Sequence, residues 1–268
     1  MLWDTHMHTH FSGDSMANTY EMVQASRKAG LDGICFTDHL DLDYLAQSPD
    51  KFLIDFPEYF REIQEIQLQF LNQFPVYIGV ELGLQPHLEH KLPAIIQEYP
   101  FDFVIGSSHM VHHMDPYYSD YYQGKTEDEA YLEYFESILE NLAVFDCFDV
   151  YGHLDYVVRY GPNTNHYYTY EKFSDVIDHI LQMLIQKGKG IEINTGGFKY
   201  GLGHPNPTEK ILKRYRELGG EIITIGADAH TPKHVAYDFQ KVPNILKEAG
   251  FKYYTVYQKR KPIFYLID

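Results

Sequence analysis

The sequence predicts a single-domain α/β barrel, and three observations support this prediction. Short apolar segments rich in β-branched and aromatic residues alternate with longer segments of helical period along the 268 residues. Such alternation predicts parallel strands that are joined by helical crossovers. About seven such units, in a chain close to the ~250 residues typical of a β/α barrel, favour a closed barrel over an open sheet. No linker, repeat or low-complexity segment divides the chain.

The predicted strands are apolar runs bounded by glycine, proline or polar residues. They cover residues 2–8, 33–39, 76–83, 102–109, 149–155, 190–197 and 221–230, with 252–258 as either an eighth strand or an edge strand. The predicted helices follow a 3.6-residue apolar period and cover residues 19–30, 57–70, 126–145, 171–188 and 207–220. Gly30, Gly188 and Gly219 lie at the ends of three of these helices, where glycine suits a C-cap.

The composition restricts the functional classes. With 22 Lys and Arg against 38 Asp and Glu, a net charge of −16, we expect no nucleic-acid partner. The one basic run, Lys259–Lys261, is expected to be a solvated edge. No apolar stretch reaches the ~20 residues of a membrane span, and we expect no membrane partner and no signal peptide. The two cysteines give no disulfide framework, which favours the cytoplasm. The sequence leaves the oligomeric state open.

Metal-affine side chains lie at the ends of the predicted strands. In chain order these strand-end residues are His6 and His8, His39, Glu81, His109, His153, Asn194, and Asp228 with His230. Because the C-terminal ends of parallel barrel strands open on one face, we expect these residues to converge. Desolvating several imidazoles and carboxylates together is costly without a cation, so the pattern predicts a metal site rather than isolated structural histidines.

The residue types indicate which chemistry this site supports. Side chains two positions apart on a strand point the same way, so His6 and His8 can reach one ion, as can Asp228 and His230. Imidazole suits zinc or iron, and carboxylates also suit manganese. A shared carboxylate such as Glu81 can hold two cations ~3.5–4 Å apart, as in two-metal hydrolases. Glu81, Asp228 and His230 are the candidates for direct catalytic roles.

The ordered motifs resemble those of the polymerase and histidinol phosphatase (PHP) family, above all its stand-alone histidinol-phosphate phosphatases. The motifs are DTHMHT (4–9), FTDH (36–39), GVELG (79–83), IGSSH (105–109), YGHLD (151–155) and GADAH (226–230). The resemblance implies that residues 1–268 form one PHP-type, metal-dependent phosphoesterase domain. Its fold would be a distorted TIM-like barrel of seven β/α units.

The resemblance also implies three divalent metal ions, which could be zinc, iron or manganese. The first would be held by His6, His8, Glu81 and Asp228, the second by Glu81, His109 and His153, and the third by Asp14, His39 and His230. The implied reaction is hydrolysis of L-histidinol phosphate, a small-molecule phosphomonoester, to L-histidinol and phosphate in histidine biosynthesis. A metal-bound hydroxide would attack phosphorus in line, because clustered cations polarise the phosphoryl oxygens and activate water.

Candidate substrate-binding residues lie on the loops beyond the strands. Arg159 is the best phosphate clamp, because guanidinium binds phosphate in a fork; the alternative is a surface ion pair with a helix. Lys199 is expected to add a second positive charge, and His204 to line the mouth of the site. The loops 38–50 and 112–124 are rich in acidic and aromatic residues, which suits the cationic groups of histidinol phosphate, although such loops also serve as packing lids.

Three other functions stay open at this point. A PHP-type protein tyrosine phosphatase would use the same metals, but the segments YGHLDYVVRYG and EINTGGFKYG resemble the histidinol-phosphatase branch. An exonuclease or other nucleic-acid phosphoesterase would need a basic groove, which the net charge disfavours. A barrel that binds metal without catalysis is disfavoured because all nine ligand positions carry ligating side chains.

Overall fold

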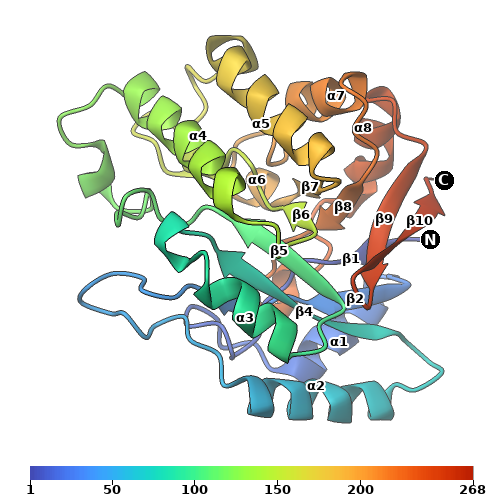
Figure 1. Ribbon diagram of the computed structural model, residues 1–268. Coiled ribbons are helices and arrows are strands. Elements are labelled where there is room, and N and C mark those ends of the chain that lie inside the picture. Colours follow the sequence, from blue (N-terminus) through green and yellow to red (C-terminus); the bar gives the residue numbers. More distant parts are fainter. Residues whose placement is uncertain (268) are drawn as a thin grey trace.

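The computed structural model describes residues 1–267 and consists of a parallel β-barrel surrounded by helices, with a small hairpin at its side (Figure 1). The barrel strands are β1 (Trp3–Asp4), β2 (Gly33–Phe36), β3 (His39–Leu40), β4 (Val76–Gly83), β5 (Phe103–Ser107), β6 (Val150–Tyr151), β7 (Gly190–Asn194) and β8 (Ile223–Gly226). The helices are α1 (Thr19–Lys28), α2 (Phe56–Gln69), α3 (Lys91–Glu98), α4 (Glu127–Val144), α5 (Ser174–Gln186), α6 (Gly196–Lys199), α7 (Glu209–Glu217) and α8 (Val242–Glu248). The hairpin pairs β9 (Tyr253–Gln258) with β10 (Lys261–Leu266).

The barrel strands follow the order β1-β2-β4-β5-β6-β7-β8, and every neighbouring pair is parallel. The short strand β3 continues β2 and also pairs with β4. Backbone hydrogen bonds close the ring between β1 and β8: the Thr5 N–H donates to the Ile225 carbonyl, and the Asp228 N–H donates to the His6 carbonyl, both at 2.9 Å. The predicted TIM-like barrel of seven β/α units is confirmed, and its distortion shows in β1 and β6, which have two residues each.

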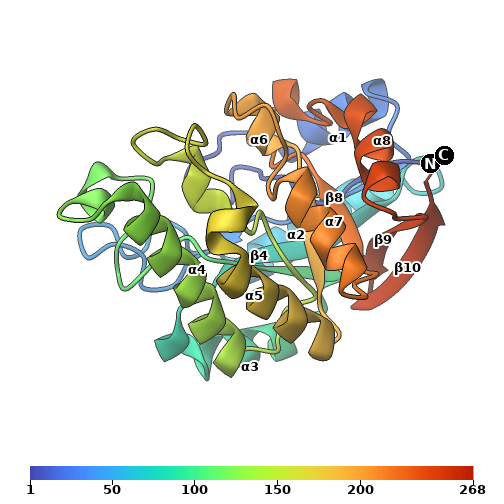
Figure 2. The ribbon, with the colours of Figure 1, turned by 90° about the horizontal axis from the view of Figure 1, so that it is seen from above.

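Helices cover the outside of the barrel, with α4, α5 and α7 side by side in both views (Figures 1 and 2). Strands β2, β5, β7 and β8 are buried at every residue, as expected for parallel strands between a core and a helical layer. Thr126 and Glu129 form a capping box that fixes the start of α4. Gly30, Gly188 and Gly219 each follow a helix with φ values of 80°, 66° and 99°, which confirms their predicted place at helix ends.

The structure also contains elements that the sequence analysis did not predict. Helices α3, α6 and α8 were missed, because each has fewer than nine residues and too few turns to establish a helical period. Within the predicted run 252–258, residues 253–258 form β9, which lies outside the barrel and pairs antiparallel with β10. Within residues 1–267, no helix combines the length and the apolar character that a bilayer crossing requires.

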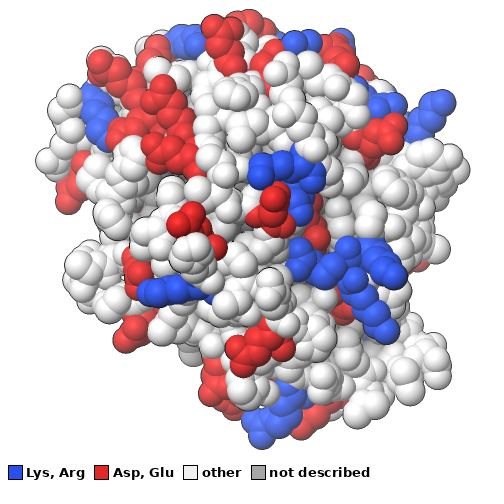
Figure 3. Space-filling model, viewed as in Figure 1, with Lys and Arg blue, Asp and Glu red and all other residues white. Residues whose placement is uncertain are grey.

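The turn of the β9–β10 hairpin corrects one expectation. Arg260 was expected on a solvated edge, but its Nε donates to Asp149 Oδ2 at 2.6 Å and its Nη2 donates to the Cys147 carbonyl at 2.9 Å. The turn therefore fastens the hairpin to the barrel, while Lys259 and Lys261 stay exposed. Lys and Arg side chains gather around this turn (Figure 3), on the side of the barrel away from the loops that extend from the strands' C-terminal ends.

Candidate metal centre

All nine predicted metal ligands lie together at the end of the barrel where the C-terminal ends of the strands open. Glu81 lies inside β4 and His39 begins β3, Asp14 comes from the loop before α1, and the other six follow a strand within four residues. The structure thus brings together residues up to 224 positions apart (His6 to His230), although their roles as metal ligands stay predictions.

Glu81 is the centre of this cluster. It is fully buried, and five imidazoles surround its carboxylate. Its Oε2 lies 3.1 Å from His6 Nε2, 3.7 Å from His8 Nε2 and 2.9 Å from His39 Nδ1, and its Oε1 lies 3.2 Å from His109 Nε2 and 2.8 Å from His153 Nε2. Two carboxylate oxygens that face different sets of histidines suit a ligand shared between two ions.

Asp228, His230 and Asp14 complete the cluster on the side of β8. Asp228 has a φ of 55°, a left-handed conformation that Asp tolerates, and its Oδ1 lies 3.4 Å from His8 Nε2. His230 Nε2 lies 3.3 Å from Asp14 Oδ2. The ligand atoms of His8, His39 and His230 also approach one another within 4.8 Å. His8 therefore lies next to the predicted third site, whose ligands are Asp14, His39 and His230.

Several nitrogens in this cluster lack hydrogen bonds. His8 Nε2, His39 Nδ1, His109 Nε2 and His153 Nδ1 are all buried, and none of them has a contact of hydrogen-bond geometry within residues 1–267, although His39 Nδ1 and His109 Nε2 lie close to Glu81. An unpaired buried polar atom is costly, and a cation would satisfy imidazole lone pairs at this position. Imidazole nitrogens beside carboxylate oxygens are the donor set of zinc, iron and manganese sites, so the residues present fit divalent ions of this class.

The electrostatics of the cluster also favour cations. Burial raises the pKa of Glu81, but His6, His109 and His39 outweigh burial and hold this pKa well below its usual range. Burial lowers the pKa of His8, and His230 and His39 lower it further. Burial also lowers the pKa of His39, yet Glu81 and Asp14 raise it to about 9. Because a ligating imidazole must be neutral, we expect metal binding near neutral pH to release protons.

Arg159 lies at the end of a 3₁₀ helix (Tyr156–Arg159) and points into the cluster. Its side chain is 2% exposed, and its Nη1 donates to Asp228 Oδ2 at 2.8 Å. Its Nε donates to Asn206 and its Nη2 to Asn194, at 2.8 and 3.0 Å. Burial lowers the pKa of Arg159, but Asp228 raises it above its ordinary value. The alternative of a surface ion pair with a helix is therefore wrong.

The other two predicted substrate-binding residues lie outside the cavity. Lys199 Nζ donates to the backbone carbonyl of Asp228 at 3.0 Å, and burial lowers the pKa of Lys199 although Asp228 raises it. His204 Nδ1 donates to the Pro205 carbonyl at 2.7 Å. Neither residue lines the cavity beside the cluster, so the geometry does not support the expectation that His204 lines the mouth or that Lys199 contacts substrate directly.

A cavity of about 280 Å³ opens beside the cluster. One part of its wall carries the metal-affine residues Asp14, His39, His109, His153, Asp228 and His230, together with Arg159. The loops 38–50 and 112–124 form another part of its wall with acidic and aromatic side chains, which are Asp41, Tyr44, Asp115, Tyr117 and Tyr118. Both loops therefore face the cavity, as the sequence suggested, and do not merely cover the core.

Two carboxylates that were not predicted from the sequence orient histidines. Asp41 Oδ1 accepts a hydrogen bond from His109 Nδ1 at 2.8 Å, and Glu192 Oε1 accepts one from His6 Nδ1 at 2.7 Å. A carboxylate behind a ligating imidazole fixes the ring and its tautomer. Asp41 also lies close enough to His39 and His109 to be a further ligand. The one local signal was Glu192, an acidic residue between Ile191 and Ile193 in β7.

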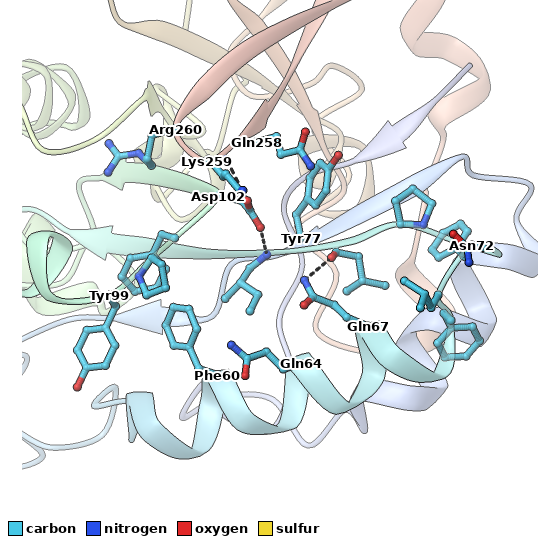
Figure 4. A pocket seen from close by; sticks show the side chains of 18 of the residues that line it. Phe60, Gln64, Gln67, Asn72, Tyr77, Tyr99, Asp102, Gln258, Lys259 and Arg260 are labelled. Carbon is cyan, nitrogen blue, oxygen red and sulfur yellow. Dashed lines mark hydrogen bonds between the residues drawn. The ribbon is translucent and has the colours of Figure 1, made fainter.

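A second cavity, about 870 Å³, is larger but lies at the opposite end of the barrel. Figure 4 shows Gln64 and Gln67 of α2 and Gln258 and Lys259 of the hairpin around it. Its lining residues include no histidine and one acid, Asp102, whose carboxylate accepts the N–H groups of Ile78 and Lys259. This cavity therefore offers no cluster of metal ligands.

Comparison with known proteins agrees with this geometry. The family model of the PHP domain matches residues 4–196, which is most of the chain. The chain belongs to the PHP-domain family. A histidinol-phosphatase from Lactococcus lactis is 34% identical over 92% of this chain and 91% of its own, and a probable histidinol-phosphatase from Clostridium acetobutylicum is 32% identical over 94% and 95%.

A solved structure shows the same fold over 98% of the chain. It is a histidinol phosphate phosphatase from Lactococcus lactis in complex with zinc, L-histidinol and phosphate. It aligns with a TM-score of 0.91 and 33% identity, covering 98% of both chains. A putative histidinol phosphatase from Listeria monocytogenes has the same fold at 19% identity, with a TM-score of 0.79.

Proposed function

We propose that this chain is a metal-dependent phosphomonoesterase that hydrolyses L-histidinol phosphate to L-histidinol and phosphate. The observation that carries the proposal is the cluster around Glu81, where buried imidazoles surround this carboxylate and Asp228 beside an arginine. The reaction and substrate are supported by similarity to relatives named histidinol-phosphatase and to one whose structure contains histidinol and phosphate.

The cluster would hold three divalent ions in the predicted sets: one by His6, His8, Glu81 and Asp228, one by Glu81, His109 and His153, and one by Asp14, His39 and His230. Bound cations would polarise the phosphoryl oxygens and lower the pKa of water. Zinc is favoured over iron and manganese because the Lactococcus lactis structure contains zinc. Among the residues of the chain, Glu81 and the neutral His8 would supply lone pairs that bind the ions.

Arg159 would bind and orient the phosphate. Of the five N–H donors of a guanidinium, three already bind Asp228, Asn194 and Asn206. One N–H therefore remains on each of the two terminal nitrogens, and each can donate a charge-assisted hydrogen bond to a phosphate oxygen. Since its other donors are engaged, Arg159 is already fixed in place and loses little conformational entropy when phosphate binds.

The wall formed by the two loops would bind the organic part of the substrate. Histidinol carries an amine and an imidazole, and Asp41 and Asp115 offer negative charge beside the rings of Tyr44, Tyr117 and Tyr118. Carboxylates and aromatic faces both attract cations. A phosphate at Arg159 and a cation between the loops would therefore fix the substrate at both ends, which favours a short cationic phosphomonoester.

We also propose that residues 1–268 act as one domain in the cytoplasm. Strand β8 and the residues after it lie beyond the part matched by the family model, yet they complete the barrel and supply Asp228 and His230. Both cysteines, Cys35 and Cys147, are free, which supports a reducing compartment.

Phosphate release by the zinc-loaded protein tests the proposed substrate. Histidinol phosphate, phosphotyrosine and a short single-stranded oligonucleotide would be compared, with metal content measured on the same sample and Glu81→Gln as the metal-deficient control. We expect kcat/KM for histidinol phosphate to exceed the values for the other two substrates at least ~100-fold. The site binds its substrate at both ends, so the wrong substrate would leave buried charges of the site unpaired. Equal, low rates on all three would exclude this substrate, and activity without metal would exclude the mechanism.

A further inference from the structure

Glu192 lies in β7 and connects several parts of the site, although the proposed reaction does not require it to touch metal or substrate. It is fully buried, and its Oε1 accepts a hydrogen bond from His6 Nδ1 at 2.7 Å. Its Oε2 accepts hydrogen bonds from the His153 backbone N–H and from Asn194 Nδ2, both at 3.0 Å. A Cβ at Gly226 of β8 would lie 2.1 Å from Glu192 Oε1, so a glycine is needed there to admit this carboxylate.

The orientation of Asn194 is fixed by its other neighbours. Its Oδ1 receives hydrogen bonds from Arg159 Nη2 at 3.0 Å and from the Gly196 N–H at 2.9 Å, and both of these groups are donors only. The Asn194 Nδ2 group must therefore face Glu192. A directed series of hydrogen bonds runs from Arg159 to Asn194 to Glu192, where it meets the bond from His6.

A further hydrogen bond connects this series to the metal-affine residues, so that the phosphate-binding arginine and the metal-binding cluster are joined. Arg159 Nη1 donates to Asp228 Oδ2 at 2.8 Å, and Asp228 lies beside the histidines. The buried carboxylate of Glu192 thus holds the imidazole of His6 directly, and it holds the guanidinium of Arg159 through Asn194. No bulk water reaches this carboxylate, because Glu192 and Asn194 are both fully buried.

We propose that Glu192 is a positioning residue that sets the tautomer of His6 and, through Asn194, the orientation of Arg159. With its proton on Nδ1, His6 presents the Nε2 lone pair toward Glu81 Oε2, 3.1 Å away. This inference rests on the proposed metal-binding role of His6. It assigns Glu192 no contact with metal or substrate.

The surroundings of Glu192 require a carboxylate rather than an amide. Three N–H donors converge on its two oxygens, from His6, His153 and Asn194. In Glu192→Gln, an amide NH2 that pointed toward His153 and Asn194 would place a donor against two other donors, the His153 backbone N–H and Asn194 Nδ2. The other orientation would place the NH2 against His6 Nδ1 and favour the tautomer with its proton on Nε2, where the metal would bind. Either arrangement weakens the site while preserving the size of the side chain.

The test measures zinc affinity by competition with a chromophoric chelator, which does not depend on any substrate. We expect Glu192→Gln to bind zinc 10- to 100-fold more weakly at its tightest site, the range found when partners of ligating histidines are removed. Asp149→Asn is the matched control, because it also converts a buried carboxylate to an amide, but at the opposite end of the barrel. It should keep wild-type zinc affinity.

Asn194→Ala separates the two connections. We expect it to keep zinc affinity within about threefold while KM for histidinol phosphate rises about tenfold, because Arg159 loses one of its fixed acceptors. Wild-type zinc affinity in Glu192→Gln would overturn the inference, as would an unchanged KM in Asn194→Ala if Glu192→Gln failed to fold. A wild-type protein that binds zinc but not histidinol phosphate would contradict the proposed substrate and leave the zinc test of Glu192 valid.

Discussion

Replacement of Arg159 by lysine tests how the phosphate is bound. Lysine keeps the positive charge next to Asp228 but lacks the planar fork, so only one phosphate contact can survive. Arg159 has two N–H groups left after its bonds to Asp228, Asn194 and Asn206. A hydrogen bond to a charged group contributes about 1.5–3 kcal/mol. Loss of one such bond should lower kcat/KM about 10- to 100-fold, mostly through KM.

The assay is steady-state phosphate release from histidinol phosphate, with zinc content measured on the same samples. Arg216→Lys is a control, because Arg216 lies on the outer surface near Gly220 and Gly250. We expect Arg159→Lys to keep its zinc, since the ion pair with Asp228 survives. A kcat/KM within threefold of wild type would refute the phosphate role, and complete loss of zinc would show that Arg159 chiefly holds Asp228.

Three further predictions concern stability and dynamics. Arg260→Met leaves the buried Asp149 without its cationic partner and should lower the free energy of unfolding by about 3 kcal/mol in urea titration, with kcat unchanged. Removal of metal by a chelator should lower Tm, and zinc at a thousand times its Kd should restore about 4 kcal/mol of stability; an unchanged Tm would contradict a metal centre in the core. Burial lowers the pKa of His112, but hydrogen bonds with Glu140 and Glu133 outweigh burial and raise it above the ordinary 6.5. That contact should be intact below pH 6.5 and lost as the pH rises through the raised pKa. The protection factors for amide exchange in residues 112–124, which remove the intrinsic rise of exchange with pH, should then fall in wild type but not in His112→Ala.

Much of the site was predictable because its parts are local in sequence. The pair His6 and His8, and the pair Asp228 and His230, show the two-residue spacing of a strand, and glycines close the helices before the next strand begins. Strand and helix periods then predict a parallel barrel, and a parallel barrel gathers all C-terminal strand ends at one face. Convergence of distant ligands follows from topology and needs no knowledge of side-chain conformations.

The sequence by itself determined the barrel, its strands and the residues placed at its open end. Only the tertiary structure decided which polar groups meet: His6 with Glu192, 186 positions apart, Arg159 with Asp228, and Arg260 with Asp149. Such pairs depend on the register between non-adjacent strands and on space left by residues such as Gly226. Periodicity places a side chain on a face of one strand, whereas a hydrogen bond requires two chains of atoms to meet within a few tenths of an ångström.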